Sequence, residues 1–151
     1  MRVLLETECP GDEILYPRRR LERAKRVFEE WASATMSEYF NVKVRVLADS
    51  DGDVHDEEFR EWLRSEGVDA DSRYAVRLNL PLVRKYAERA REKGAAALLV
   101  LRMRCGGGVT YRYYAIALLE PRPDAPKAPP SWLALLAAMK HPRYRAAVID
   151  V

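Results

Sequence analysis

Alternating apolar and polar residues predict strands at several places along the chain. In the stretch 42–48, Val42, Val44 and Val46 alternate with Lys43 and Arg45, which is typical of a strand with one buried face. The same criteria predict strands at 2–6, 42–48, 74–80, 95–105, 109–119 and 145–151. Gly106, Gly107 and Gly108 separate two of these segments, so 95–119 is predicted to form a β-hairpin.

Apolar residues at steps of three and four predict helices between the strands. The clearest spans 17–40, and a short one is expected to begin near Val54 or His55. Pro81 suits the first position of a helix that runs to Lys93, and Ser131 suits the cap of an apolar helix over 132–140.

The predicted fold is a single α+β domain over 1–151. Its core is expected to be a ferredoxin-like βαββαβ arrangement with an inserted short helix and a C-terminal β-α-β extension. The alternative is an α/β mixed sheet with helices on both faces. Residues 120–130 contain five of the nine prolines and are expected to form a stiff connector to the last helix and strand.

The composition is globular, with 48% hydrophobic and 32% charged residues, and no apolar run reaches the length of a membrane span. Glutamine is absent and only two asparagines occur, a bias typical of hyperthermophiles. The start of the chain lacks a signal-peptide pattern, so a cytoplasmic location is expected. Cys9 and Cys105 are expected to be free thiols, with a bridge between them as the alternative.

Residues 49–58 carry the densest group of carboxylates. Asp49, Asp51 and Asp53 place hard oxygens in one loop, the ligand type that Mg²⁺ or Mn²⁺ prefers. The DSDGD run resembles the front half of an EF-hand calcium loop, although Val54 stands where that loop needs glycine. Glu6 together with Asp49 and Asp51 also resembles the toprim domain of topoisomerases and primases, which implies a metal site formed by these residues. The alternative is that the carboxylates only complement the dipole of the following helix.

Basic residues are concentrated in the second half of the chain. Residues 1–75 contain 12 basic and 18 acidic side chains, net −6, whereas 76–151 contain 14 and 5, net +9. In the predicted hairpin, Arg102, Arg104, Arg112 and Tyr114 share one face, which is typical of single-strand nucleic-acid binders. A second cluster opens the first helix and comprises Arg18, Arg19, Arg20, Arg23 and Arg26. The alternatives are protection of a sheet edge by the hairpin arginines and internal ion pairs for the helix arginines.

Three functions are therefore expected in order of preference. The first is binding of RNA or single-stranded DNA through the nine basic and aromatic residues just named. The second is a Mg²⁺- or Mn²⁺-dependent phosphodiester hydrolase or toprim-like enzyme that uses Glu6, Asp49 and Asp51. The third is a structural homo-oligomeric subunit, with association into a homodimer expected through the C-terminal helix or strand.

Overall fold

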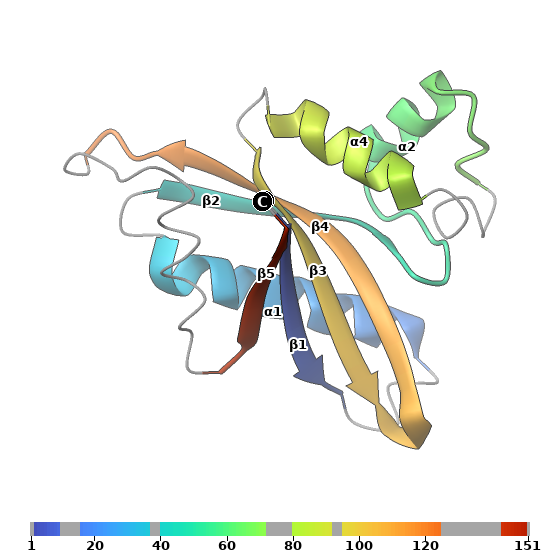
Figure 1. The fold of residues 1–151 in the computed structure, drawn as a ribbon, viewed down its shortest axis with the longest axis horizontal. Helices are drawn as coiled ribbons and strands as arrows, with labels where there is room; N and C mark the ends of the chain where they lie inside the picture. The colour runs from blue at the N-terminus through green and yellow to red at the C-terminus, as the bar shows by residue number, and fades with distance from the viewer. Residues whose placement is uncertain are drawn as a thin grey trace.

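A computed structural model of the chain describes residues 2–9, 16–36, 40–71, 80–91, 95–124 and 143–150. Within these residues, one five-stranded mixed sheet has helices packed against both of its faces (Figure 1). The elements are β1 (Arg2–Glu8), α1 (Pro17–Met36), β2 (Phe40–Asp49), α2 (Glu57–Ser65), α4 (Leu80–Arg91), β3 (Ala95–Cys105), β4 (Val109–Pro121) and β5 (Arg145–Asp150). The predicted α+β class is confirmed.

The strand order in the sheet is β2-β4-β3-β1-β5. β1 pairs in parallel with β3, and the other three pairs are antiparallel. The predicted β-hairpin is confirmed, and a 3₁₀ turn at Gly106–Gly108 joins β3 to β4. Gly107 and Gly108 have φ values of 79° and 75°, a region that residues with a Cβ rarely adopt, so this turn depends on glycine.

One face of the sheet is covered by α1. Leu99, Leu101 and Met103 alternate along β3 and are fully buried on this side. Phe28 and Trp31, which are three positions apart on α1, pack against them. This face is called the α1 face below, and it holds the larger of two hydrophobic clusters in the described residues.

The opposite face is partly covered by α2 and α4. Phe59 and Trp62 of α2 contact Tyr86 of α4, with ring centroids 5.0 and 5.3 Å from that of Tyr86. These rings lie over Leu98 and Ile116, which are residues of β3 and β4 that point away from α1. This side is called the α4 face, and the helices that the structure describes leave its hairpin end uncovered (Figure 1).

The ferredoxin-like core is not confirmed. Such a core groups its helices on one side of an antiparallel sheet, whereas β1 and β3 pair in parallel and α1 and α4 lie on opposite faces. Three predicted elements fall wholly or largely outside the described residues: the strand 74–80, the connector 120–130 beyond residue 124, and the helix 132–140. β4 continues to Pro121, so the strand runs into the predicted connector.

β5 is the final strand, as predicted, and it pairs with β1 of its own chain. The terminal segment is therefore held in the sheet of the same molecule. None of the helices that the structure describes is both long enough and apolar enough to span a membrane.

The expectation of free thiols is wrong, because Cys9 and Cys105 form a disulfide. The parallel register sets Glu8 of β1 beside Arg104 of β3, so the next residue of each strand falls at the same level. The backbone N–H of Cys9 also donates a hydrogen bond to the carbonyl oxygen of Arg104, at 2.9 Å. The Cα atoms of the two cysteines are consequently 4.9 Å apart, within the usual span of a disulfide.

Candidate functional site

The uncovered end of the α4 face carries arginines from β3, β4 and β5, and β1 lies between β3 and β5 in the sheet. Paired residues of a sheet point to the same side, and one register row runs through Arg145 of β5, Glu6 of β1, Arg102 of β3 and Arg112 of β4. We call Arg102, Arg104, Arg112 and Arg145, together with Tyr114, the arginine patch. The prediction that the hairpin residues of this set share one face is confirmed, because the residues between them are packed on the α1 face.

Two carboxylates lie among these arginines. Glu6 Oε1 is 3.4 Å from Arg102 Nη1, and the exposed Glu8 is paired in register with Arg104. Four arginines against two glutamates leave a local formal charge of +2. Within the part of the chain that the structure describes, Arg104, Arg112 and Arg145 form no ion pair. Their charges are therefore available to an anionic partner.

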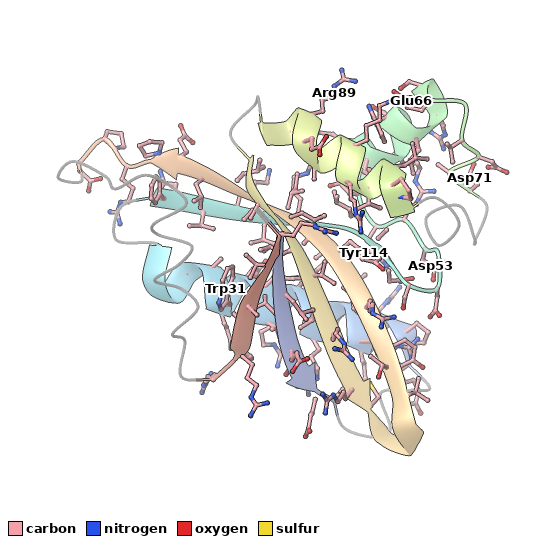
Figure 2. All side chains as sticks on the ribbon, in the orientation of Figure 1. Trp31, Asp53, Glu66, Asp71, Arg89 and Tyr114 are labelled. Carbon is pink, nitrogen blue, oxygen red and sulfur yellow. A yellow bond between two sulfur atoms is a disulfide. The ribbon has the colours of Figure 1, made fainter. Side chains whose placement is uncertain are left out.

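Tyr114 lies at the boundary between the patch and the helices. Its ring is half-buried against the α4-face core, where β4 passes under α4 (Figure 2). Burial raises the pKa of Tyr114, Arg112 acts to lower it, Asp49 acts to raise it, and Arg84 has the weakest, lowering effect. The tyrosine is thus neutral at physiological pH.

A shallow pocket of about 320 Å³ opens at the end of the patch, lined by Glu6, Thr7, Glu8, Arg104 and Arg145. Arg145 was not among the residues predicted from the sequence to bind. Arg145 joins the patch only because β5 pairs with β1. That pairing has no local sequence signal.

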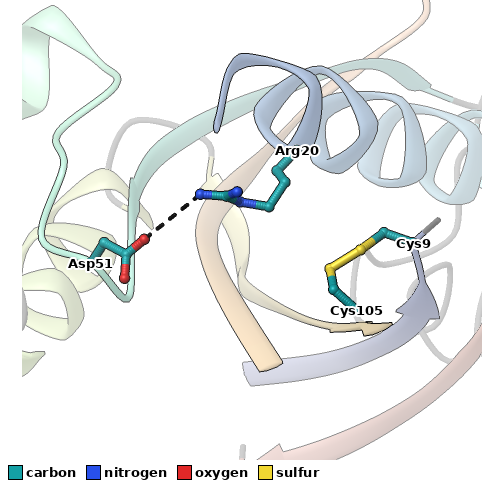
Figure 3. Close-up of a disulfide and its surroundings, with 4 residues drawn as sticks. All are labelled: Cys9, Arg20, Asp51 and Cys105. Carbon is teal, nitrogen blue, oxygen red and sulfur yellow. Dashed lines mark ion pairs between the residues drawn. A yellow bond between two sulfur atoms is a disulfide. The ribbon is translucent and has the colours of Figure 1, made fainter. Parts of the chain in front are cut away.

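The basic residues that open α1 lie on the other side of the sheet. Arg18, Arg19 and Arg26 are exposed and Arg23 is half-buried, so this cluster and the arginine patch do not form one surface. Arg20 is only 5% exposed. Its guanidinium group lies 4.0 Å from the ring centroid of Tyr111, and Arg20 Nη2 is 4.0 Å from Asp51 Oδ2 (Figure 3). Arg20 is therefore a buried structural residue and is not placed to contact a ligand.

The acidic loop at the end of β2 is held together by internal hydrogen bonds. Asp49 Oδ1 accepts hydrogen bonds from the backbone N–H groups of Asp51 and Asp53, at 2.9 and 3.2 Å. Asp49 Oδ2 lies 2.7 Å from His55 Nε2, a pair that the sequence did not predict. With 7% of its surface exposed, Asp49 is occupied as the organising residue of this loop.

The structure does not bring Glu6 to the three aspartates. Glu6 and Asp49 are on strands separated by β3 and β4, roughly 14 Å apart at the usual strand spacing. Glu6 also points to the α4 face with Arg102, whereas Asp49 is paired with Tyr113 on the α1 face. No group of three or more metal-ligating side chains occurs among the described residues. Of the four residues predicted to bind Mg²⁺ or Mn²⁺, Asp49, Asp51 and Asp53 share one loop, and Glu6 lies apart from them.

Comparison with protein-family models, curated proteins and solved structures finds no match to this chain. The chemistry of the arginine patch has to be judged from its own geometry. Several guanidinium groups at successive levels of a sheet, with an aromatic ring at one end, can bind a chain of phosphates and stack on a base.

Proposed function

We propose that the arginine patch binds single-stranded nucleic acid. The observation that supports this most directly is the placement of Arg104, Arg112 and Arg145 on an uncovered sheet face without ion pairs in the described chain. Arginine binds phosphate through bidentate hydrogen bonds, and several such contacts release counterions from a polyanion. The net positive charge of the second half of the chain agrees with this proposal.

A single strand fits this surface better than a duplex. Duplex readers insert a helix or a narrow ribbon into a groove, whereas the patch extends across the sheet from β4 through β3 and β1 to β5. Single-strand binders combine a basic sheet surface with rings on which bases stack. Tyr114 offers such a ring beside Arg112, and its phenol is uncharged, so it does not repel phosphate.

Fluorescence anisotropy with a labelled dT20 strand tests this proposal. On single strands, each neutralised phosphate contributes about −0.7 to the slope of log K against log salt concentration. We expect a slope of about −2 to −3 for the wild-type protein. The Arg104→Ala/Arg112→Ala variant removes two contacts and should make the slope shallower by about 1.4.

A matched double variant on the α1 side provides the control. Arg18→Ala/Arg26→Ala removes the same charge from two exposed arginines on the opposite side of the sheet. We expect its slope to equal that of the wild type. Salt-independent affinity of the wild type, or an equal change of slope in both double variants, contradicts binding at the arginine patch.

A further inference from the structure

A second cationic site lies on the side of α4 that faces away from the arginine patch. It is formed between α4, α2 and the edge strand β2. A pocket of about 240 Å³ is lined by Lys43 and Arg45 of β2, Glu58 of α2, Tyr86, Arg89 and Ala90 of α4, and Leu118 of β4. Lys43 and Arg45 are two residues apart on a strand, so both point into it. Three basic side chains and one carboxylate thus line this pocket. Its volume is smaller than that of most pockets that bind organic ligands.

Arg45 is held rigidly at the base of this pocket. Its Nε and Nη2 donate to the two carboxylate oxygens of Asp56, and Nη2 also donates to the hydroxyl oxygen of Tyr86, at 2.8 Å. Asp56 is fixed in turn, because it caps α2 by accepting a hydrogen bond from the backbone N–H of Phe59, at 2.9 Å. These bonds raise the pKa of Arg45 and leave its Nη1 directed toward Glu58.

Glu58 is the weakest partner in this arrangement. Its Oε2 lies 3.2 Å from Arg45 Nη1, yet its side chain is 77% exposed, against 13% for Arg45. An ion pair with so exposed a side chain contributes little to stability. Lys43 and Arg89 are exposed and form no ion pair within the described residues. A small anion could therefore replace the Glu58 carboxylate and contact three cations at once.

We propose that this pocket binds a phosphate dianion, either free or as the terminal group of a small phosphomonoester, in the position now taken by the Glu58 carboxylate. Arg45 Nη1 provides a fixed donor, Lys43 and Arg89 provide charge, and Ala90 and Leu118 form an apolar wall for the organic part of an ester. The site is separate from the arginine patch, so its failure leaves the proposed nucleic-acid binding untouched.

Isothermal titration calorimetry of the full chain with inorganic phosphate tests the proposal, with sodium chloride at equal ionic strength as the reference. We expect saturable binding of phosphate only. Lys43→Met/Arg89→Met should weaken it at least tenfold, and Glu58→Gln should strengthen it about threefold because the competing carboxylate is lost. Both variants change exposed side chains, and their melting temperatures confirm that they fold.

A control and a second ligand complete the experiment. Lys25→Met/Arg26→Met removes two exposed cations from α1 and should bind phosphate like the wild type. Glycerol 3-phosphate that binds at least tenfold more tightly than phosphate identifies an ester as the ligand, and equal affinities identify free phosphate. Absence of saturable heat, or equal affinities of the wild type and Lys43→Met/Arg89→Met, overturns the proposal.

Discussion

The two faces of the sheet differ in chemistry although the same strands supply both. On the α1 face, Leu101 and Met103 of β3 are fully buried under a long helix. On the α4 face, Arg102 and Arg104 of the same strand alternate with them and point away from that core. A period of two therefore places the stabilising residues and the candidate binding residues one peptide bond apart, so the two roles can be tested separately.

Removing the disulfide is expected to have the largest effect. The bridge joins residues 96 positions apart, and a loop of this size constrains the unfolded chain by about 4–5 kcal/mol in the chain-entropy model. Cys9→Ser/Cys105→Ser should lower the free energy of unfolding by up to this amount in chemical denaturation. Its affinity for dT20 at 25 °C should stay within about twofold. A variant as stable as the wild type contradicts a structural role for the bridge.

The second prediction compares neighbouring residues on opposite faces. Leu101→Ala should lower the free energy of unfolding by about 3 kcal/mol, because it opens a cavity in the α1-face core. Arg102→Ala removes only a partly exposed ion pair with Glu6 and should change stability by less than about 1 kcal/mol. Urea denaturation of both variants gives these values. Equal losses in the two variants would mean that the α4 face is packed as tightly as the α1 face.

Alkaline pH should weaken the α1 face through Tyr113. Burial raises the pKa of this tyrosine to about 12 from an ordinary value near 10. The unfolded chain then loses this proton more readily than the folded protein, so the stabilisation is complete below pH 10 and lost as pH rises toward 12. The free energy of unfolding should fall by about 2 kcal/mol across this range because of Tyr113 alone.

Tyr113→Phe isolates this contribution. The variant lacks the ionisable hydroxyl, so its free energy of unfolding should fall less steeply between pH 10 and 12 than that of the wild type. Tyr16→Phe, at a residue that is 50% exposed, serves as the control and should follow the wild-type curve. Parallel curves for the wild type and Tyr113→Phe are incompatible with the raised pKa.

Local pattern was sufficient to predict most of the described elements. The strand 95–105 and the glycine turn after it match the structure, because alternation and turn chemistry depend on neighbours in sequence. The same alternation correctly separated Arg102 and Arg112 from Leu101 and Tyr113. The burial of Arg20 is not predicted, although Arg20 lies four positions before the buried Ala24, because charged side chains are usually exposed.

Strand order could not be predicted from local pattern. The parallel pairing of β1 with β3 brings Cys9 to Cys105 and Glu6 to Arg102, and no short-range signal specifies that pairing. The strand order also separates Glu6 from Asp49, two residues that the sequence predicts to share one metal site. Both relations depend on contacts between segments that are distant in sequence.

The most direct test of the account is to locate bound nucleic acid on the folded protein. Backbone amide shifts measured by NMR during titration with dT20 should change in the hairpin segment 102–114 and in β5 near Arg145. The exposed side of α1, including Arg18 and Arg26, should remain unchanged. Shifts confined to α1, or none at saturating dT20, would contradict the assignment of binding to the arginine patch.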